Sequence, residues 1–169
     1  ATTVKRVTWM TAGQQALMIR PMPVEVQEKF DATVGQAVDA DNVAVQIAGE
    51  TFTRVVQGED GVNRLETYQG TVNLQVASVD PGQDSMDPAP GEMMGLDIGS
   101  QETALVSGGM ISVEATDDEG NPLQIRDGRS VNVNYHIPAD FDAAEGDELP
   151  LWYFNEDTNR WEQEGSCTV

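Results

Sequence analysis

The chain contains few of the residues from which catalytic centres are usually built. Its 169 residues include one histidine, His136, and one cysteine, Cys167. Because a single cysteine cannot form an internal disulfide, Cys167 is either an inert thiol or half of an intermolecular disulfide. The G-x-S-x-G, H-E-x-x-H and phosphate-loop motifs are missing as well. These absences predict a protein that is not an enzyme.

Long apolar runs and basic residues are also scarce. No stretch is apolar for long enough to cross a bilayer, so a membrane span is not expected. There are 29 acidic residues and only 9 basic ones, which gives a formal net charge of −20. Nucleic-acid binding requires clustered Lys and Arg, so this composition excludes it. Such a chain is expected to resist aggregation and to attract divalent cations.

Acidic residues are missing altogether from the first 24 positions, which carry Lys5, Arg6 and Arg20. This segment is either the first strand of its own sheet or an arm that docks on the acidic body of a neighbouring copy. The sequence therefore predicts residues 1–24 as an arm or first strand and 25–169 as one domain. The predicted interface residues are Val4, Lys5, Arg6, Val7, Trp9 and Met10.

What the chain does contain is alternation of apolar and polar residues with a period of two. It occurs in 71–76, 111–115 and 130–137, and it is typical of strands with one buried and one solvated face. Gly and Pro turn signals, as in 118–122 and 127–128, separate these segments at intervals of about ten residues. The pattern predicts an all-β fold, an antiparallel Greek-key-like β-sandwich with an N-terminal arm or strand.

Three acidic clusters are candidate Ca²⁺ sites, because this cation prefers several carboxylate and carbonyl oxygens on one loop. They lie at Asp80, Asp84 and Asp87, at 117–119, and at 140–148. None of them matches an EF-hand loop, so solvated turns are the default interpretation. The alternative is a Ca²⁺ site in the third cluster, with the ligands Asp140, Asp142, Glu145 and Asp147.

Aromatic residues gather near the end of the chain, at Trp152, Tyr153, Phe154 and Trp161. Residues 155–159 are predicted to turn a hairpin, which returns Trp161 on the partner strand. Cross-strand packing of these rings would stabilise the hairpin. The alternative is a ligand platform of Trp152, Phe154 and Trp161, because flat apolar rings suit the faces of sugars.

A series of motifs between Gly70 and Ser166 resembles a block that recurs in large secreted bacterial surface proteins. The same block is similar to an extracellular region of vertebrate cartilage intermediate layer proteins. The resemblance implies a non-enzymatic β-sandwich module located outside the cell or on its surface. The motifs, in order, are VDP at 79–81, PGEM at 90–93, LVSGGM at 105–110, GNPL at 120–123, GRSV at 128–131, IP at 137–138, LPLWYF at 149–154 and WEQEGS at 161–166.

Proteins with this block usually continue into one more strand after the Glu-Gly-Ser segment, whereas this chain ends at Val169. The chain is a fragment, or the family pattern is altered, or the missing pairing comes from elsewhere. An open sheet edge is a template for strand addition, and the N-terminal segment is a candidate to fill it. If the segment comes from the next copy, the contact repeats head to tail and gives a filament.

These expectations combine into a structural or adhesive module that assembles through its N-terminal segment. The alternative is a glycan- or peptide-binding module of an adhesin, with or without Ca²⁺. An accessory domain of a secreted enzyme would have the same sequence features.

Overall fold

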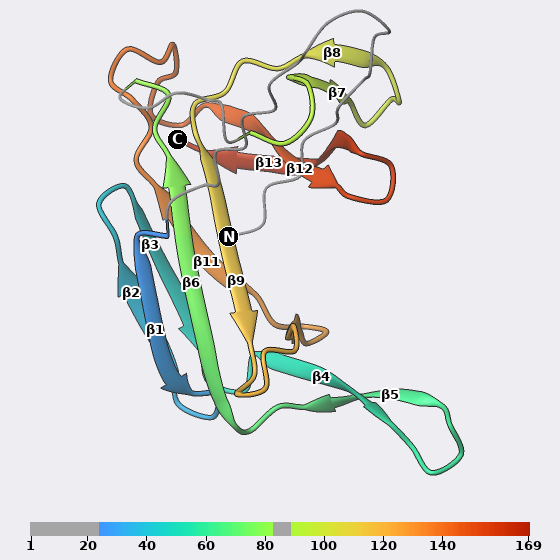
Figure 1. Cartoon of the computed structure of the whole chain (residues 1–169). Coiled ribbons are helices and arrows are strands. Elements are labelled where there is room, and N and C mark those ends of the chain that lie inside the picture. The colour runs from blue at the N-terminus through green and yellow to red at the C-terminus, as the bar shows by residue number, and fades with distance from the viewer. Residues whose placement is uncertain (1–23, 83–88) are drawn as a thin grey trace, which may run out of the picture. The chain divides into compact units, whose positions relative to one another are not determined.

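The computed structural model describes residues 24–82 and 89–169 (Figure 1). The described chain is all-β, with thirteen strands and no helix, so none of its elements is a helix that could cross a membrane. It divides into two compact units that are interleaved in sequence. The sandwich unit contains residues 24–78 and 111–136, and the hairpin unit contains residues 79–82, 89–110 and 137–169.

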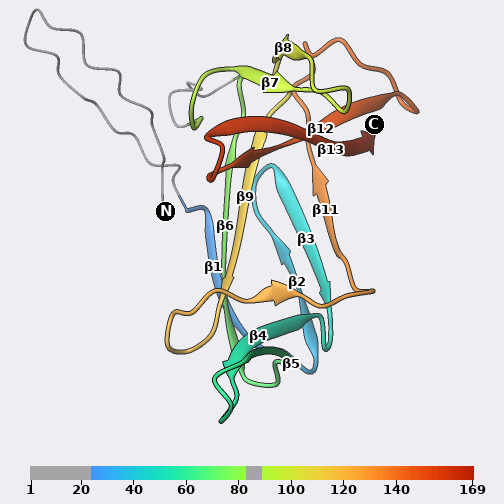
Figure 2. The same cartoon turned by 90° about the vertical axis from the view of Figure 1, so that its right-hand side faces the viewer.

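The sandwich unit is made of three small sheets (Figure 2). In the first sheet, β6 (Thr71–Val79) lies between β1 (Val26–Asp31) and β9 (Met110–Thr116). In the second, β3 (Val43–Ala48) lies between β2 (Gly35–Asp39) and β11 (Val131–Tyr135). In the third, β4 (Phe52–Gln57) lies between β5 (Asn63–Thr67) and β10 (Gln124–Ile125). Strands β1 and β6 pair antiparallel, and so do all neighbours in the second and third sheets.

The core of the sandwich unit lies between the first two sheets. The predicted alternation in β6 is confirmed, since Val72, Leu74 and Val76 are buried while the polar residues between them are partly exposed. In β3, Val43, Val45 and Ile47 are buried in the same way. Burial of these side chains supplies most of the stability of such a layer. The fold is therefore sandwich-like, while its Greek-key connections stay a prediction. The other buried core residues are Phe30, Ala32, Val38, Phe52 and Tyr68.

The chain passes from the first sheet to the second in a tight turn after β1. The Asp31 carboxylate accepts hydrogen bonds from the backbone N–H of Thr33 at 2.8 Å and from its hydroxyl at 2.6 Å. These bonds, the hydroxyl one above all, lower the pKa of Asp31. At the end of the turn Gly35 has a φ of +85°, a conformation that L side chains rarely adopt.

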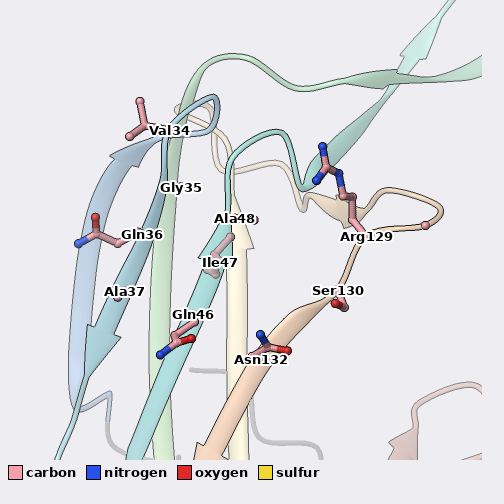
Figure 3. Close-up of a pocket in the computed structure, with 11 residues that line it drawn as sticks. Val34, Gly35, Gln36, Ala37, Gln46, Ile47, Ala48, Arg129, Ser130 and Asn132 are labelled. Atoms are coloured by element: carbon pink, nitrogen blue, oxygen red, sulfur yellow. The ribbon is translucent and has the colours of Figure 1, made fainter.

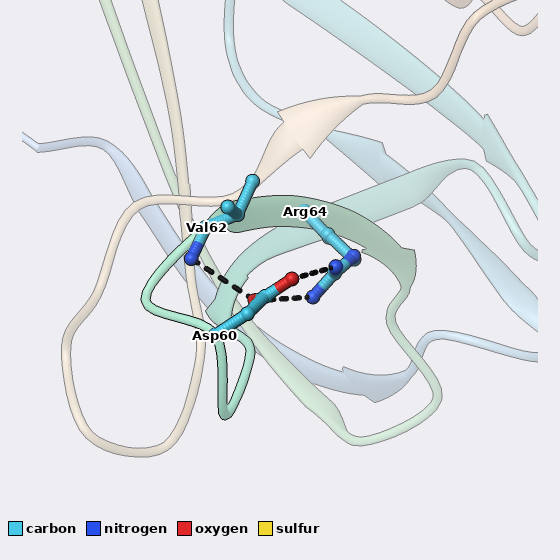
Figure 4. A network of polar contacts seen from close by, with 3 residues as sticks. All are labelled: Asp60, Val62 and Arg64. Carbon is cyan, nitrogen blue, oxygen red and sulfur yellow. Dashed lines mark hydrogen bonds and ion pairs between the residues drawn. The ribbon is translucent and has the colours of Figure 1, made fainter.

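The β4–β5 hairpin differs from the expected pattern because β5 has no buried face. Its turn is closed by Asp60, whose carboxylate pairs with the Arg64 guanidinium and accepts the Val62 N–H at 3.1 Å (Figure 4). The pair with Arg64 is the main reason that the pKa of Asp60 is lowered. No alternation in the sequence could mark this strand, since both of its faces meet water.

The hairpin unit holds one four-stranded sheet in the order β12-β13-β7-β8. Its strands are β7 (Met94–Leu96), β8 (Glu102–Ala104), β12 (Glu148–Asn155) and β13 (Arg160–Thr168). The pairing is antiparallel except for a short parallel ladder between β13 and β7, which the sequence did not predict. Its buried cluster contains Val79, Ala89, Met110 and Trp161, with Met93, Leu105, Trp152 and Phe154 packed against it.

Two predicted turns are confirmed by their backbone conformation. Gly120 and Gly128 have φ values of +84° and +75°. In the first of these turns, the Asp117 carboxylate accepts the N–H groups of Glu119 and Asn121 at 2.9 and 2.8 Å. The side-chain amide of Asn121 donates to it at 3.0 Å, and hydrogen bonding by Asn121 is the leading cause of the lowered pKa of Asp117.

Candidate functional site

The aromatic hairpin is packed as the cross-strand interpretation predicts. Phe154 and Trp161 are directly paired between β12 and β13, and their rings meet edge to face with centroids 5.5 Å apart. The Trp161 indole N–H donates to the Pro90 carbonyl at 3.0 Å. Trp152 packs beside them against Gly95, where an added Cβ would lie 2.6 Å from the indole ring. All three rings use part of their surface in the buried cluster. A glycan platform on them stays a prediction.

The outward face of the hairpin carries a polar network around Glu162. Its carboxylate accepts hydrogen bonds from the Thr158 hydroxyl at 2.8 Å, the Tyr153 hydroxyl at 2.8 Å and the Asn155 amide at 3.1 Å. These three donors, with Thr158 contributing most, lower the pKa of Glu162. The bond to Glu162 raises the pKa of Tyr153. The network fixes the turn at 155–159, where Asn159 adopts a φ of +56°.

Glu162→Gln is expected to lower the melting temperature of the hairpin unit at pH 7. Because the folded pKa of Glu162 lies below its unfolded value, its stabilisation is complete above the unfolded pKa, near about 4.3, and disappears as the pH falls through the folded value. The difference in melting temperature between wild type and Glu162→Gln should therefore disappear as the pH is lowered. Thermal unfolding is followed by tryptophan fluorescence. Glu156→Gln removes the same charge from the adjacent turn of the same hairpin and serves as control. If Glu162→Gln and Glu156→Gln lowered the melting temperature by the same amount at every pH, the network around Glu162 would have no stabilising role.

The acidic loops are largely occupied with their own turns. Asp117 is buried and fully engaged, as described above. In the third cluster, the Asp147 carboxylate accepts the Ala144 N–H at 2.9 Å. Asp80 accepts the Gly82 N–H at 2.8 Å, whereas Asp84 and Asp87 lie outside the described residues. No group of three or more metal-ligating side chains converges within residues 24–82 and 89–169. The Ca²⁺ site at Asp140, Asp142, Glu145 and Asp147 stays a prediction.

The edge of β13 is partly open. Strand β12 pairs along nearly all of β13, but β7 pairs only with Trp161 and Glu162. On the β7 side, no strand within the described chain pairs with 163–168. Ser166, Cys167 and Thr168 are exposed there, and Cys167 is a free thiol. The motifs predict a sheet that lacks one strand beside its last one. In the described chain, β7 pairs with β13 on that side at Trp161 and Glu162.

A hollow of about 670 Å³ lies on the outer face of the second sheet of the sandwich unit (Figure 3). We call it the amide hollow. At one end of it, Ala37 of β2, Gln46 of β3 and Asn132 of β11 form one row across three strands. Arg129 lies at its rim. Sequence reasoning placed Asn132 on a solvated face but assigned it no role. The hollow is further lined by Val34, Gly35, Ala48 and Ser130.

The predicted interface residues Val4, Lys5, Arg6, Val7, Trp9 and Met10 lie outside the described residues. The resemblance to bacterial surface proteins stays an expectation from motifs. No protein-family model, characterised protein or solved structure matches the chain.

Proposed function

We propose that the chain is a structural or adhesive module of an extracellular assembly, in which residues 1–20 of one copy add as a strand to the next. The observation that carries the proposal is the open part of β13. A strand edge with unpaired backbone donors and acceptors is a template for another strand. Six residues, 163–168, span about 20 Å at roughly 3.3 Å per residue, which suits the seven-residue segment 4–10.

Charge favours the same pairing. Exposed Asp147, Glu148 and Glu164 lie on or beside the open end of the β12–β13 hairpin. The N-terminal segment is free of acid and carries Lys5 and Arg6. Opposite charges steer such an encounter, and salt weakens it. A contact of this kind uses two different surfaces, so it extends into a filament unless the rotation closes a ring.

Deleting residues 1–20 is expected to convert assemblies of the full chain into monomers, as measured by light scattering after size-exclusion chromatography. The comparison is made with Cys167→Ser in both proteins, which removes disulfide-linked species. Assembly should also slow hydrogen exchange of the amides at 164–168. A full chain that is monomeric at high concentration, and unchanged by the deletion, would overturn the proposal.

A charge-swap series tests the location of the contact. Lys5→Glu with Arg6→Glu should dissociate the assembly, and Glu148→Lys with Glu164→Lys on the same chain should restore it. If only the first pair of substitutions matters, the N-terminal segment docks at another surface.

A further inference from the structure

We propose that the amide hollow binds a neutral glycan. The proposal does not depend on assembly through residues 1–20, because every residue of the hollow belongs to the sandwich unit. It also differs from the aromatic platform considered for the β12–β13 hairpin.

The first observation is the lack of charge on this face. The chain carries 29 acidic residues, yet the residues that line the hollow include no acid, and Arg129 at the rim is their single charged member. The Arg129 guanidinium is 3.7 Å from the Glu50 carboxylate. The outward residues of β3 are Ala44, Gln46 and Ala48, alternating with buried Val45 and Ile47. The lining of the hollow is thus free of acid in a strongly anionic protein, and the carboxylate on the same outward face, Asp39, lies two residues farther along β2 than Ala37.

The second observation is that the two amides at one end of the hollow are free. Within the described chain, the side chains of Gln46 and Asn132 make no hydrogen bond or ion pair. Other asparagine amides are used to hold the fold: Asn73 donates to the Asp117 carbonyl at 2.7 Å, and Asn121 donates to the Asp117 carboxylate at 3.0 Å. Gln46 and Asn132 lie side by side in the strand register, so their donors and acceptors are presented together.

These features select the class of ligand. Each primary amide offers two donors and an acceptor, which complements hydroxyl groups that both donate and accept. An anion would be opposed by the net charge of −20, and a cation would find no carboxylate in the hollow. An apolar ligand would leave the amides unpaired at a cost. A neutral polyhydroxyl ligand meets none of these objections.

The shape of the hollow agrees with this class. The hollow is open to solvent, so a ligand would lie along the sheet face and would not be enclosed. Ala37 and Ala48 are small and exposed, so a sugar ring can approach the sheet closely. Val34, which is 77% exposed at the rim, offers an apolar contact for the C–H face of a ring. Figure 3 shows the Gln46 and Asn132 amides on neighbouring strands at the lower end of this surface.

The test uses the full chain and a panel of neutral oligosaccharides, namely cellohexaose, maltohexaose and chitohexaose, with sialylated and sulfated glycans for comparison. Binding is followed by chemical-shift changes of the Gln46 and Asn132 side-chain amides. At least one neutral probe should bind, with an affinity that changes less than about twofold between 50 and 500 mM NaCl. Gln46→Ala and Asn132→Ala should each weaken binding about tenfold.

Asn63→Ala, on exposed β5, is the matched control and should leave the affinity unchanged. Tyr153→Ala removes the exposed aromatic ring of the hairpin and should do the same. The proposal is overturned if no neutral probe binds, if acidic glycans bind more tightly, or if Tyr153→Ala and not Gln46→Ala abolishes binding. The proposal is also contradicted if the Gln46 and Asn132 amide signals shift with protein concentration but not with any added glycan, because the face would then be a contact between copies of the chain.

Discussion

Trp161→Ala is expected to destabilise the hairpin unit by about 3–5 kcal/mol. Trp161 is only 9% exposed and packs in the cluster with Val79 and Met110. The substitution removes the ring that meets Phe154 edge to face and leaves the Pro90 carbonyl without its donor. Since whole domains are stable by about 5–15 kcal/mol, such a loss brings the unit close to unfolding. Urea denaturation followed by the remaining tryptophan fluorescence measures it.

Two companions separate packing from hydrogen bonding. Trp161→Phe keeps an aromatic ring but loses the N–H, so it should cost about 1–2 kcal/mol. Leu151→Ala lies on the same hairpin but on its outward face, where Leu151 is 50% exposed, and should cost about 0.5 kcal/mol. If Leu151→Ala were as damaging as Trp161→Ala, the two faces of the hairpin would have been assigned the wrong way round.

Gly35→Ala is expected to destabilise the sandwich unit by about 2–5 kcal/mol. A Cβ at this position would lie 2.4 Å from the Ile47 carbonyl oxygen and 2.7 Å from backbone atoms of Ala48 and Gly49. Backbone atoms cannot rotate away as a flexible side chain can, so β2 or β3 must move. The positive φ of Gly35 adds strain of its own. The loss of far-UV circular dichroism with urea is the measurement.

Gly61→Ala is the matched control, because Gly61 has a similar φ of +74° but open space around its Cβ position. It should cost only the conformational strain, about 1–2 kcal/mol. The difference between the two variants isolates the contact between the β1–β2 turn and β3. Equal losses would show that the close approach at Gly35 has no energetic consequence.

The period-two pattern predicted β6 in full, and β9 and β11 only in part, since Val113 and Val133 on their apolar faces are exposed. In β6, Val72, Leu74 and Val76 alternate with polar residues in sequence and in burial alike. The hairpin of β12 and β13 was predicted for a similar reason, since its aromatic residues flank a polar turn. Strand β5 gave no such signal because all of its residues are exposed. The parallel ladder of β7 with β13 joins residues about 66 positions apart, from Gly95 to Trp161, and no local pattern encodes such a partner.

The candidate sites were less predictable than the strands. Acidic residues were abundant, so the sequence could not distinguish carboxylates that hold turns, such as Asp31 and Asp117, from those free to bind a cation. The amide hollow needed the register, which places Gln46 beside Asn132 although 85 residues separate them. The lack of acidic residues in 43–48 is no signal by itself, since 67–79 and 128–139 are also free of acid.

The interleaving of the two units has a consequence for the order of events during synthesis. Strand β3 acquires β11 as its second neighbour only after Val131–Tyr135 have left the ribosome. The cluster of Val79, Ala89, Met110 and Trp161 is completed later, because Trp161 is the last of these four residues to be synthesised. A nascent chain that ends near residue 140 therefore holds the complete sandwich sequence, while the apolar partners of Trp161 have no ring to cover them. In that interval the growing chain is most vulnerable to association, and the acidic residues that follow position 24 oppose association by charge repulsion.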